Sequence, residues 1–211
     1  MGAGKKARLP TEYQEVEWIG ATGTQIINTG IVPGTNLFRV QIGFYKETQT
    51  TNSMAVVGGY VNGDQYQRFS VSLRTGTNKI GIYSSSWDEY VVPNLYGHKI
   101  DVDVIFSETQ PYASGIISAD NNQTAINKSS ANFNNLGQGR IYLFSSSDTT
   151  RTAFTGRIYY FRYSQPDGTV IANFVPCYRL SDGIIGMYDL VSDNFFTNIQ
   201  SGTFTKGPDV S

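Results

Sequence analysis

The chain has 211 residues, a formal net charge of −1 at pH 7 and 16% charged residues, with one cysteine and one histidine. This length allows one large domain with its own core, and the near-zero charge argues against a nucleic-acid-binding function, because a phosphate backbone needs a basic surface. The single cysteine excludes an internal disulfide, and one cysteine with one histidine excludes the usual zinc ligand sets.

The N-terminus, residues 1 to 8, is basic, with Lys5, Lys6 and Arg8 in the sequence MGAGKKAR. No apolar run follows it, so the pattern does not predict a secretory signal. No later segment has the length and apolarity of a membrane span, and we expect no membrane insertion. We predict a flexible or docking tail over residues 1 to 8 and a single domain over residues 9 to 211.

Most of the chain alternates apolar and polar residues with a period of two, and helical spacing is nearly absent. Clusters of Gly, Asn, Thr and Pro separate the alternating runs. The pattern predicts an all-β, two-sheet antiparallel jelly-roll sandwich with few or no helices. In chain order, the predicted strands cover residues 24–31, 37–45, 54–60, 68–74, 79–85, 98–106, 113–119, 139–146, 156–164, 170–179, 184–190 and 195–198.

The connections carry their own signals. The sequences PDGT at 166–169 and SDG at 181–183 predict tight turns between adjacent antiparallel strands, because glycine tolerates a positive φ. The polar stretch at 120–138 is too long for a simple connection, and we expect an irregular loop or a short helix there with a role at the surface.

Both ends of the chain carry specific motifs. Residues 9–31 contain Leu-Pro, a tyrosine, Val-Glu-Trp-Ile and Thr-Gly-Thr-Gln, and the later motifs are FTGRI at 154–158 and PCYR with DG, G and YD at 176–189. With these motifs the chain resembles the concanavalin A-like lectin/glucanase superfamily, in the laminin G-like jelly-roll version found in gut Gram-positive bacteria and their phages. The resemblance implies a two-sheet jelly roll. It does not fix an activity, because such folds carry lectins, glucanases and virion proteins.

Cys177 is the first candidate for chemistry. A nucleophilic cysteine needs a nearby base, and His98 is the only histidine. Cys177 lies in an apolar run beside Val175 and Pro176, so we interpret it as a small buried residue. The segment 173–198 is then expected to close the fold, with its last strands near residues 24–31.

Glycoside hydrolysis needs two carboxylates held near each other. Asp101 and Asp103 share one face of a predicted strand because side chains alternate. The resemblance implies a third acid on the catalytic strand of the glucanases, and Phe106 occupies that position. We therefore predict no catalytic residue and no enzymatic activity, with hydrolysis the less favoured alternative.

A metal site would have to use oxygen ligands, as calcium sites do. The segments 62–64, 119–122 and 145–148 offer oxygens without a diagnostic spacing. We predict no metal-ligating residue and no cofactor, and we keep calcium as an alternative.

Sugar binding needs an aromatic face for the apolar side of the ring and polar side chains for the hydroxyl groups. Trp87 lies in a polar stretch, where it is harder to assign to a core than Trp18. The candidate glycan-binding residues are Trp87, Tyr90, Tyr66, Tyr60, Asp64, Arg68 and Asp88.

The resemblance, the polar and cysteine-poor composition and the lack of a predicted secretory signal favour a non-catalytic phage virion protein on the virion surface, either a capsid decoration or head fibre, or a tail component that binds host-surface glycans. The expected partners are other virion proteins, a host glycan and further copies of the chain, because virion components follow particle symmetry. The alternative is a carbohydrate-binding module of a bacterial cell-surface protein, located outside the cell.

Overall fold

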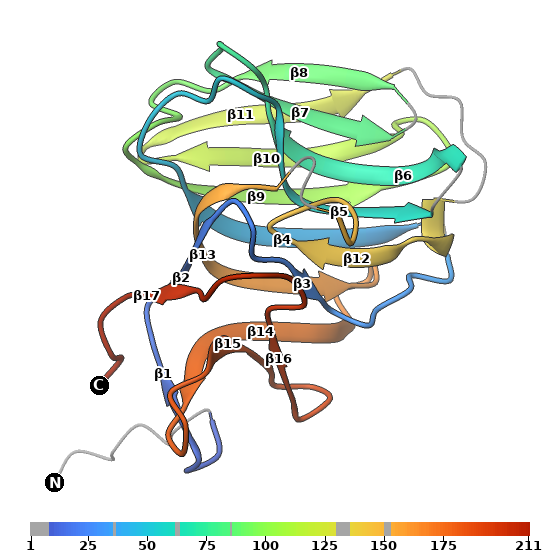
Figure 1. Ribbon diagram of the computed structural model, residues 1–211. Coiled ribbons are helices and arrows are strands. Elements are labelled where there is room, and N and C mark those ends of the chain that lie inside the picture. The colour runs from blue at the N-terminus through green and yellow to red at the C-terminus, as the bar shows by residue number, and fades with distance from the viewer. Residues whose placement is uncertain (1–8, 36, 62–63, 85, 130–135, 150–152) are drawn as a thin grey trace, which may run out of the picture.

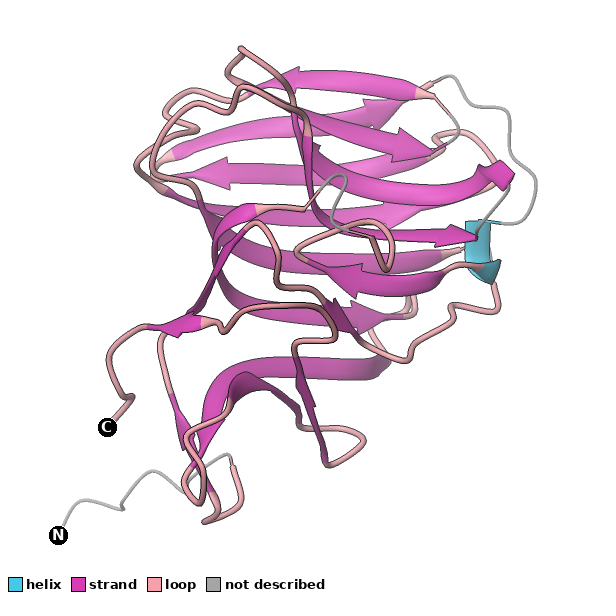
Figure 2. Cartoon of the chain, viewed as in Figure 1, coloured by secondary structure: helices cyan, strands magenta, loops and turns pink. Residues whose placement is uncertain are grey.

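The computed structural model describes residues 9–35, 37–61, 64–84, 86–129, 136–149 and 153–211, and side chains are described for all of these except residues 60, 61 and 64–68. Two antiparallel sheets pack face to face (Figure 1). Within the described residues the only helix is a 3-10 turn, Leu136–Gln138, cyan in Figure 2. The predicted all-β sandwich is confirmed.

The larger sheet has eleven strands within the described residues. Its main path joins β11 (Asn122–Lys128), β10 (Ala113–Ala119), β9 (Lys99–Phe106), β4 (Phe38–Tyr45), β13 (Thr155–Ser164), β14 (Val170–Arg179), β15 (Ile185–Asp189) and β16 (Asn194–Thr197). Off this path, β1 (Tyr13–Glu15) pairs with β14, while β2 (Ile19–Thr22) pairs with β13 and β17 (Thr205–Lys206).

The smaller sheet has six described strands. Their order is β3 (Ile27–Asn28), β12 (Arg140–Leu143), β5 (Met54–Val61), β6 (Asp64–Leu73), β7 (Lys79–Ser84) and β8 (Trp87–Val91). The edge strand β8 lies in the same part of the molecule as β11, the edge strand of the larger sheet (Figure 1).

The core lies between the sheets and follows the alternation in the sequence. On β4 every second residue from Phe38 to Phe44 is fully buried, and β9 repeats this from Ile100 to Phe106. Phe38 contacts Phe69 of the facing sheet with ring centroids 4.9 Å apart. Burial of each such side chain contributes roughly 1.5–3 kcal/mol to the stability of the fold. The side chains that alternate with them on β4 and β9 form the outer face of the sheet.

The segment 120–138, expected to be an irregular loop or a short helix, begins with the strand β11 and ends with the short 3-10 helix Leu136–Gln138, while residues 130–135 lie outside the described residues. Asp120, at φ 52°, makes a tight turn, and β11 then pairs along the whole of β10. Only Ile126 and Lys128 of this edge strand are buried, so its polar sequence hid the strand. Likewise only Ile27–Asn28 of the predicted strand 24–31 is paired as a strand.

The turns and the closure are confirmed. Gly168 (φ 94°) and Gly183 (φ 71°) lie in the loops that join β13 to β14 and β14 to β15, which are adjacent pairs. Asn198, directly after β16, accepts a hydrogen bond from the Ile26 amide at 2.9 Å. The end of the segment 173–198 therefore meets the strand near residue 27.

Cys177 is fully buried in a small second cluster with Leu9, Val175 and Tyr188. Burial raises the pKa of its thiol to about 12, with a further contribution from the Glu15 carboxylate. His98 Nδ1 instead contacts Asp120 Oδ2 at 2.7 Å. The thiol is therefore a packing group, as the sequence predicted.

Replacing Cys177 with serine is expected to lower the free energy of unfolding by about 1 kcal/mol, because a more polar hydroxyl replaces the thiol inside a cluster of buried side chains. Urea unfolding at neutral pH measures this change. A folded Cys177→Ser protein with the stability of the wild type would contradict the packing role.

Alkaline conditions are expected to destabilise the fold. Burial raises the pKa of both Cys177 and Tyr163 to about 12, whereas in an unfolded chain the thiol titrates near pH 8.5 and the phenol near pH 10. The unfolded state therefore loses protons first, and stability falls as the pH rises from roughly 9 towards 12. Urea midpoints at about pH 8 and about pH 11 test this, and the drop is expected to be smaller in Cys177→Ser.

Candidate functional site

The predicted glycan-binding residues on β8 do not share one surface. Trp87 packs on Tyr83 with ring centroids 4.8 Å apart, and the Arg74 guanidinium lies 4.3 Å from the centre of the indole ring. A Cβ at Gly81 would lie 2.7 Å from the indole, so this glycine makes room for it. Trp87 is thus held within its own sheet and is partly covered by Arg74.

Asp88 and Tyr90 alternate with Trp87 on β8 and make different contacts. Asp88 Oδ1 accepts a hydrogen bond from Lys128 Nζ at 2.9 Å, and Tyr90 packs against the core. The strand therefore separates these two residues from the indole. Tyr60, Asp64, Tyr66 and Arg68 lie on β5 and β6 with side chains outside the described part, so their role stays a prediction.

The Lys128 side chain is 0% exposed. Its Nζ donates to both Asp88 and Ser86 Oγ, at 2.9 and 3.0 Å, and the pair joins β11 of the larger sheet to β8 of the smaller. A buried ammonium needs such partners, because removing a charge from water costs several kcal/mol. This ion pair connects the two edge strands.

Asp101 and Asp103, the acids weighed for hydrolysis, do share the outer face of β9. Arg39 makes two hydrogen bonds to Asp103, one of them from Nε at 2.7 Å, and Gln41 adds a third at 3.0 Å. Asp101 Oδ1 accepts from the Tyr160 hydroxyl at 2.9 Å and lies 3.3 Å from Lys99 Nζ. Both carboxylates are acceptors in a network that holds neighbouring side chains in place.

A β-bulge in β13 changes the direction of the next side chains. Ile158 pairs with Phe44 and Tyr160 pairs with Gly43, so Tyr159 is an extra residue without a partner on β4. Lys99 Nζ lies 5.3 Å from the centre of the Tyr159 ring and 5.4 Å from that of Tyr160. Two consecutive tyrosines therefore reach the same side of the sheet.

The ring of Tyr160 lies across Gly43. A Cβ at this glycine would lie 2.5 Å from Tyr160 Cε1, so only glycine leaves room for the ring. The hydroxyl donates to Asp101, and burial together with this carboxylate raises the pKa of Tyr160 well above its usual range. The phenol stays protonated. Tyr160 is fixed at its backbone by the strand β13 and at its hydroxyl by Asp101.

Tyr160 is one of the residues that line a cavity of about 680 Å³. We call it the sheet-face groove. Its volume lies within the roughly 300–1,000 Å³ typical of small-ligand sites. The residues that line it are Gln41, Lys99, Tyr159, Tyr160, Arg162, Asn173 and Val175 from the sheet, with Glu15, Val16, Glu17 and Val210 from the terminal segments.

Several polar groups in the groove have no partner within the described structure. Arg162 is exposed, and its guanidinium makes no hydrogen bond or ion pair with a described residue. The side-chain amide of Asn173 and the carboxylate of Glu17 likewise make no hydrogen bond or ion pair with a described residue. A cation, an amide and a carboxylate beside an aromatic ring form a set suited to a polyhydroxylated ligand.

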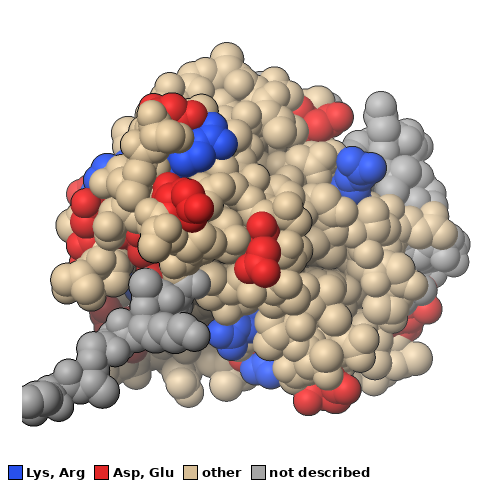
Figure 3. Space-filling view, turned by 90° about the horizontal axis from the view of Figure 1, so that it is seen from below, with Lys and Arg blue, Asp and Glu red and all other residues tan. Residues whose placement is uncertain are grey.

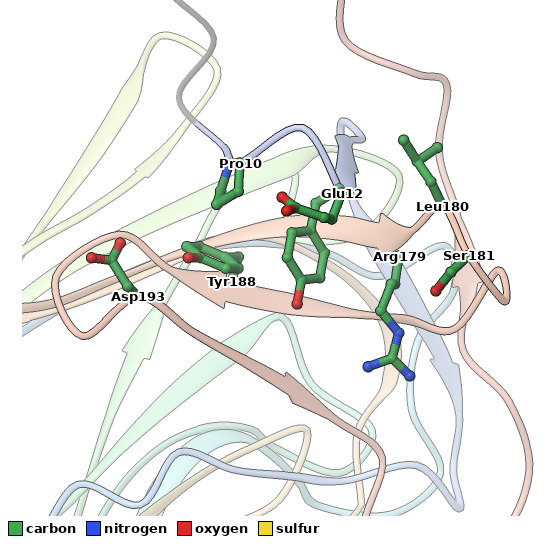
Figure 4. A pocket seen from close by; sticks show the side chains of 8 residues that line it. Pro10, Glu12, Arg179, Leu180, Ser181, Tyr188 and Asp193 are labelled. Carbon is green, nitrogen blue, oxygen red and sulfur yellow. The ribbon is translucent and has the colours of Figure 1, made fainter.

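A second cavity, of about 560 Å³, lies where β1 meets β14 and β15 (Figure 4). Its aromatic side, Tyr13 and Tyr188, is packed with ring centroids 5.0 Å apart. Arg179 is bound to Asp182, with Nη2 2.6 Å from Oδ2. The motifs at the two chain ends thus meet here in packing that closes the fold.

Neither the surface charge nor a group of metal ligands indicates a further site among the described residues. The underside in Figure 3 carries separate small groups of acidic and basic side chains, in keeping with the net charge of −1. No group of three or more His, Cys, Asp or Glu side chains in the described part of the chain is placed to hold a metal ion. No helix there is long and apolar enough to span a membrane.

No family model matches the chain, and no curated protein matches it. Solved structures do. A heptameric pentraxin from Limulus polyphemus is 12% identical with a TM-score of 0.52, covering 71% of this chain and 76% of that one. A putative carbohydrate-binding protein from Bacteroides ovatus is 10% identical with a TM-score of 0.58; the alignment covers 94% of this chain but only 62% of that protein. The concanavalin A-like jelly roll is confirmed, and at these identities the likeness shows the fold alone.

Proposed function

We propose that this protein is a non-catalytic carbohydrate-binding module that binds sugar in the sheet-face groove. The observation that carries the proposal is the Tyr160 ring, which lies across Gly43, is held by the hydrogen bond of its hydroxyl to Asp101, and belongs to a residue that lines the cavity. A flat aromatic face is what the apolar side of a sugar ring packs against. Arg162 and Asn173 stand beside it with unused donors for hydroxyl groups.

Binding fits this face better than hydrolysis does. A retaining or inverting mechanism needs one carboxyl group that gives up a proton and a second that attacks or activates water. Asp103 is engaged by Arg39 and Gln41, and Asp101 by Tyr160 and Lys99. Both carboxylates support the groove from the sheet, and neither lines it. The acids that do line it, Glu15 and Glu17, lie in the segment that pairs with β14 and belongs to the opening motif of the fold.

A glycan-binding module is the alternative function predicted from the sequence. The proposed site lies on the larger sheet, whereas the candidate residues predicted from the sequence lie on the smaller one. The Bacteroides structure, described as a putative carbohydrate-binding protein, has the same fold and supports this choice. The virion setting is an expectation from the sequence alone, and neither structure named above is described as a virion protein. In either setting the module would work at a surface that presents glycans.

A glycan array probed with the full chain tests the proposal. We expect binding to at least one class of glycan, confirmed in solution by calorimetry. A chain that is folded by circular dichroism and binds no glycan at millimolar concentration would contradict the proposal.

Trp87→Ala separates the two candidate surfaces. Because Arg74 partly covers the indole and Trp87 lies on the smaller sheet, we expect this variant to bind the best array glycan within about twofold of the wild type, a change of roughly 0.4 kcal/mol. Calorimetry measures the affinity. A tenfold loss of glycan affinity in a folded variant would indicate that the glycan binds at β8 instead.

A further inference from the structure

We infer that the sheet-face groove selects acidic sugars, and that Arg162 is the residue that binds the carboxylate or sulfate group of the ligand. The inference rests on the proposed function and adds to it the chemical class of the glycan. It follows from the way in which the strand register distributes charged side chains along the groove.

Arg162 and Tyr160 are neighbours on the outer face of the larger sheet. They are two residues apart on β13, and their partners Gln41 and Gly43 are two residues apart on β4. Side chains at this spacing point to the same face of a sheet, and about 7 Å of strand separates them. A sugar that packs on Tyr160 can therefore place an acidic substituent beside the Arg162 guanidinium.

Two other basic side chains on this face already have carboxylate partners. Arg39 makes two hydrogen bonds to Asp103, and Lys99 Nζ lies 3.3 Å from Asp101 Oδ1. Arg162 lines the groove, is exposed, and has no carboxylate partner among the described residues. Its positive charge is therefore available to a ligand.

Asn173 adds a fixed neutral donor next to this charge. It pairs with Arg162 across β13 and β14, and its backbone amide donates to Asp189 Oδ1 at 2.7 Å. The Asp189 carboxylate is buried and accepts two further backbone amides at 3.2 Å, so it is bound within its own turn. The Asn173 side-chain amide is left beside the guanidinium in the groove.

The two acids that line the groove belong to its other end. β1 runs along the later part of β14, where Glu15 pairs with Cys177, and Glu17 follows it in the chain. Cys177 lies four residues beyond Asn173 on β14, which corresponds to roughly 13 Å along a strand. The groove therefore has a basic end at Arg162 and an acidic end at Glu15 and Glu17, with Tyr160 between them.

A guanidinium at the basic end favours an anion over a neutral hydroxyl group. Its planar fork presents parallel N–H donors that match the two oxygens of a carboxylate, and a sulfate group offers similar acceptors. Hydrogen bonds between charged partners are stronger than those between neutral ones. An acidic sugar is thus expected to bind at least about tenfold more tightly than its neutral counterpart.

The test uses a glycan array on which each acidic glycan is printed beside its neutral counterpart. Uronic acids are paired with their methyl esters, and sulfated sugars with the unsulfated parents, so the two arms show which anion is selected. A preference of at least about tenfold in either arm supports the inference. Equal binding within every pair overturns it and leaves the proposed function standing, whereas absence of binding to every printed glycan overturns the proposed function itself.

Variants assign the preference to one residue. Arg162→Gln is expected to bring the ratio of acidic to neutral affinity close to one, and Arg162→Lys, which keeps the charge and loses the fork, to retain about threefold. Arg157→Gln is the matched control, because it removes the same charge from β13 while its guanidinium lies over the Trp18 and Tyr45 rings and does not line the groove. We expect this control to keep the full preference.

Calorimetry measures the ratio for each variant, and circular dichroism confirms that each is folded. A folded Arg162→Gln protein that keeps the preference for the acidic glycan contradicts the inference. An equal loss of preference in Arg157→Gln would also contradict it, because the effect would then come from the overall charge of the protein.

Discussion

Tyr160→Ala is expected to weaken glycan binding at least about tenfold, or 1.4 kcal/mol. The substitution removes the ring that covers Gly43 in the lining of the cavity, and with it the hydrogen bond to Asp101. Calorimetry with the best array glycan measures the loss. Tyr160→Phe keeps the ring and loses only the hydroxyl contact, so it is expected to retain affinity within about threefold, or roughly 0.7 kcal/mol.

Gly43→Val also tests the role of the Tyr160 ring, and it does so without replacing a residue that lines the groove. Any side chain at this position collides with the Tyr160 ring, since even a Cβ would lie 2.5 Å from it. The ring must then leave its place over β4, and affinity is expected to fall nearly as far as in Tyr160→Ala. A folded Gly43→Val protein with wild-type affinity would show that the position of Tyr160 is irrelevant to binding.

Asp88→Ala is expected to lower the free energy of unfolding by about 3 kcal/mol, because it leaves the buried Lys128 ammonium without its carboxylate. Urea unfolding at neutral pH measures the loss. A double variant, Asp88→Ala with Lys128→Met, removes the buried charge as well and is expected to recover most of the stability.

Glu89→Ala is the matched control on the next residue. Glu89 pairs with Arg74 and Lys79 at 2.8 and 3.0 Å, but all three side chains are partly exposed. Such pairs contribute about 0–1 kcal/mol, so this variant should differ little from the wild type. A loss in Asp88→Ala no larger than in Glu89→Ala would contradict the account of Lys128.

Much of the fold could be predicted because core strands alternate strictly. The strands that begin at Phe38 and Lys99 carry apolar residues at every second position, and the Gly168 and Gly183 turns have their own sequence signals. The edge strands were missed for the opposite reason. No described side chain of β8 is buried, and only Ile126 and Lys128 of β11 are, so neither strand shows the strict apolar alternation of a core strand.

The site was harder to predict, since it depends on side chains from strands far apart in the sequence. Tyr160 meets Asp101 across 59 positions, and nothing near either residue announces the pairing. The bulge at Tyr159 also breaks the period-two rule that would have placed consecutive tyrosines on opposite faces. The same rule, applied to residues 87–90, would have separated Trp87 from Asp88 and Tyr90.

The most direct test of carbohydrate binding in the sheet-face groove is an NMR titration of the labelled protein with the best array glycan. The account predicts that the largest amide shift changes fall on β4, β13 and β14, around Gly43, Tyr160 and Asn173. Changes centred on β7 and β8, around Trp87, would contradict it.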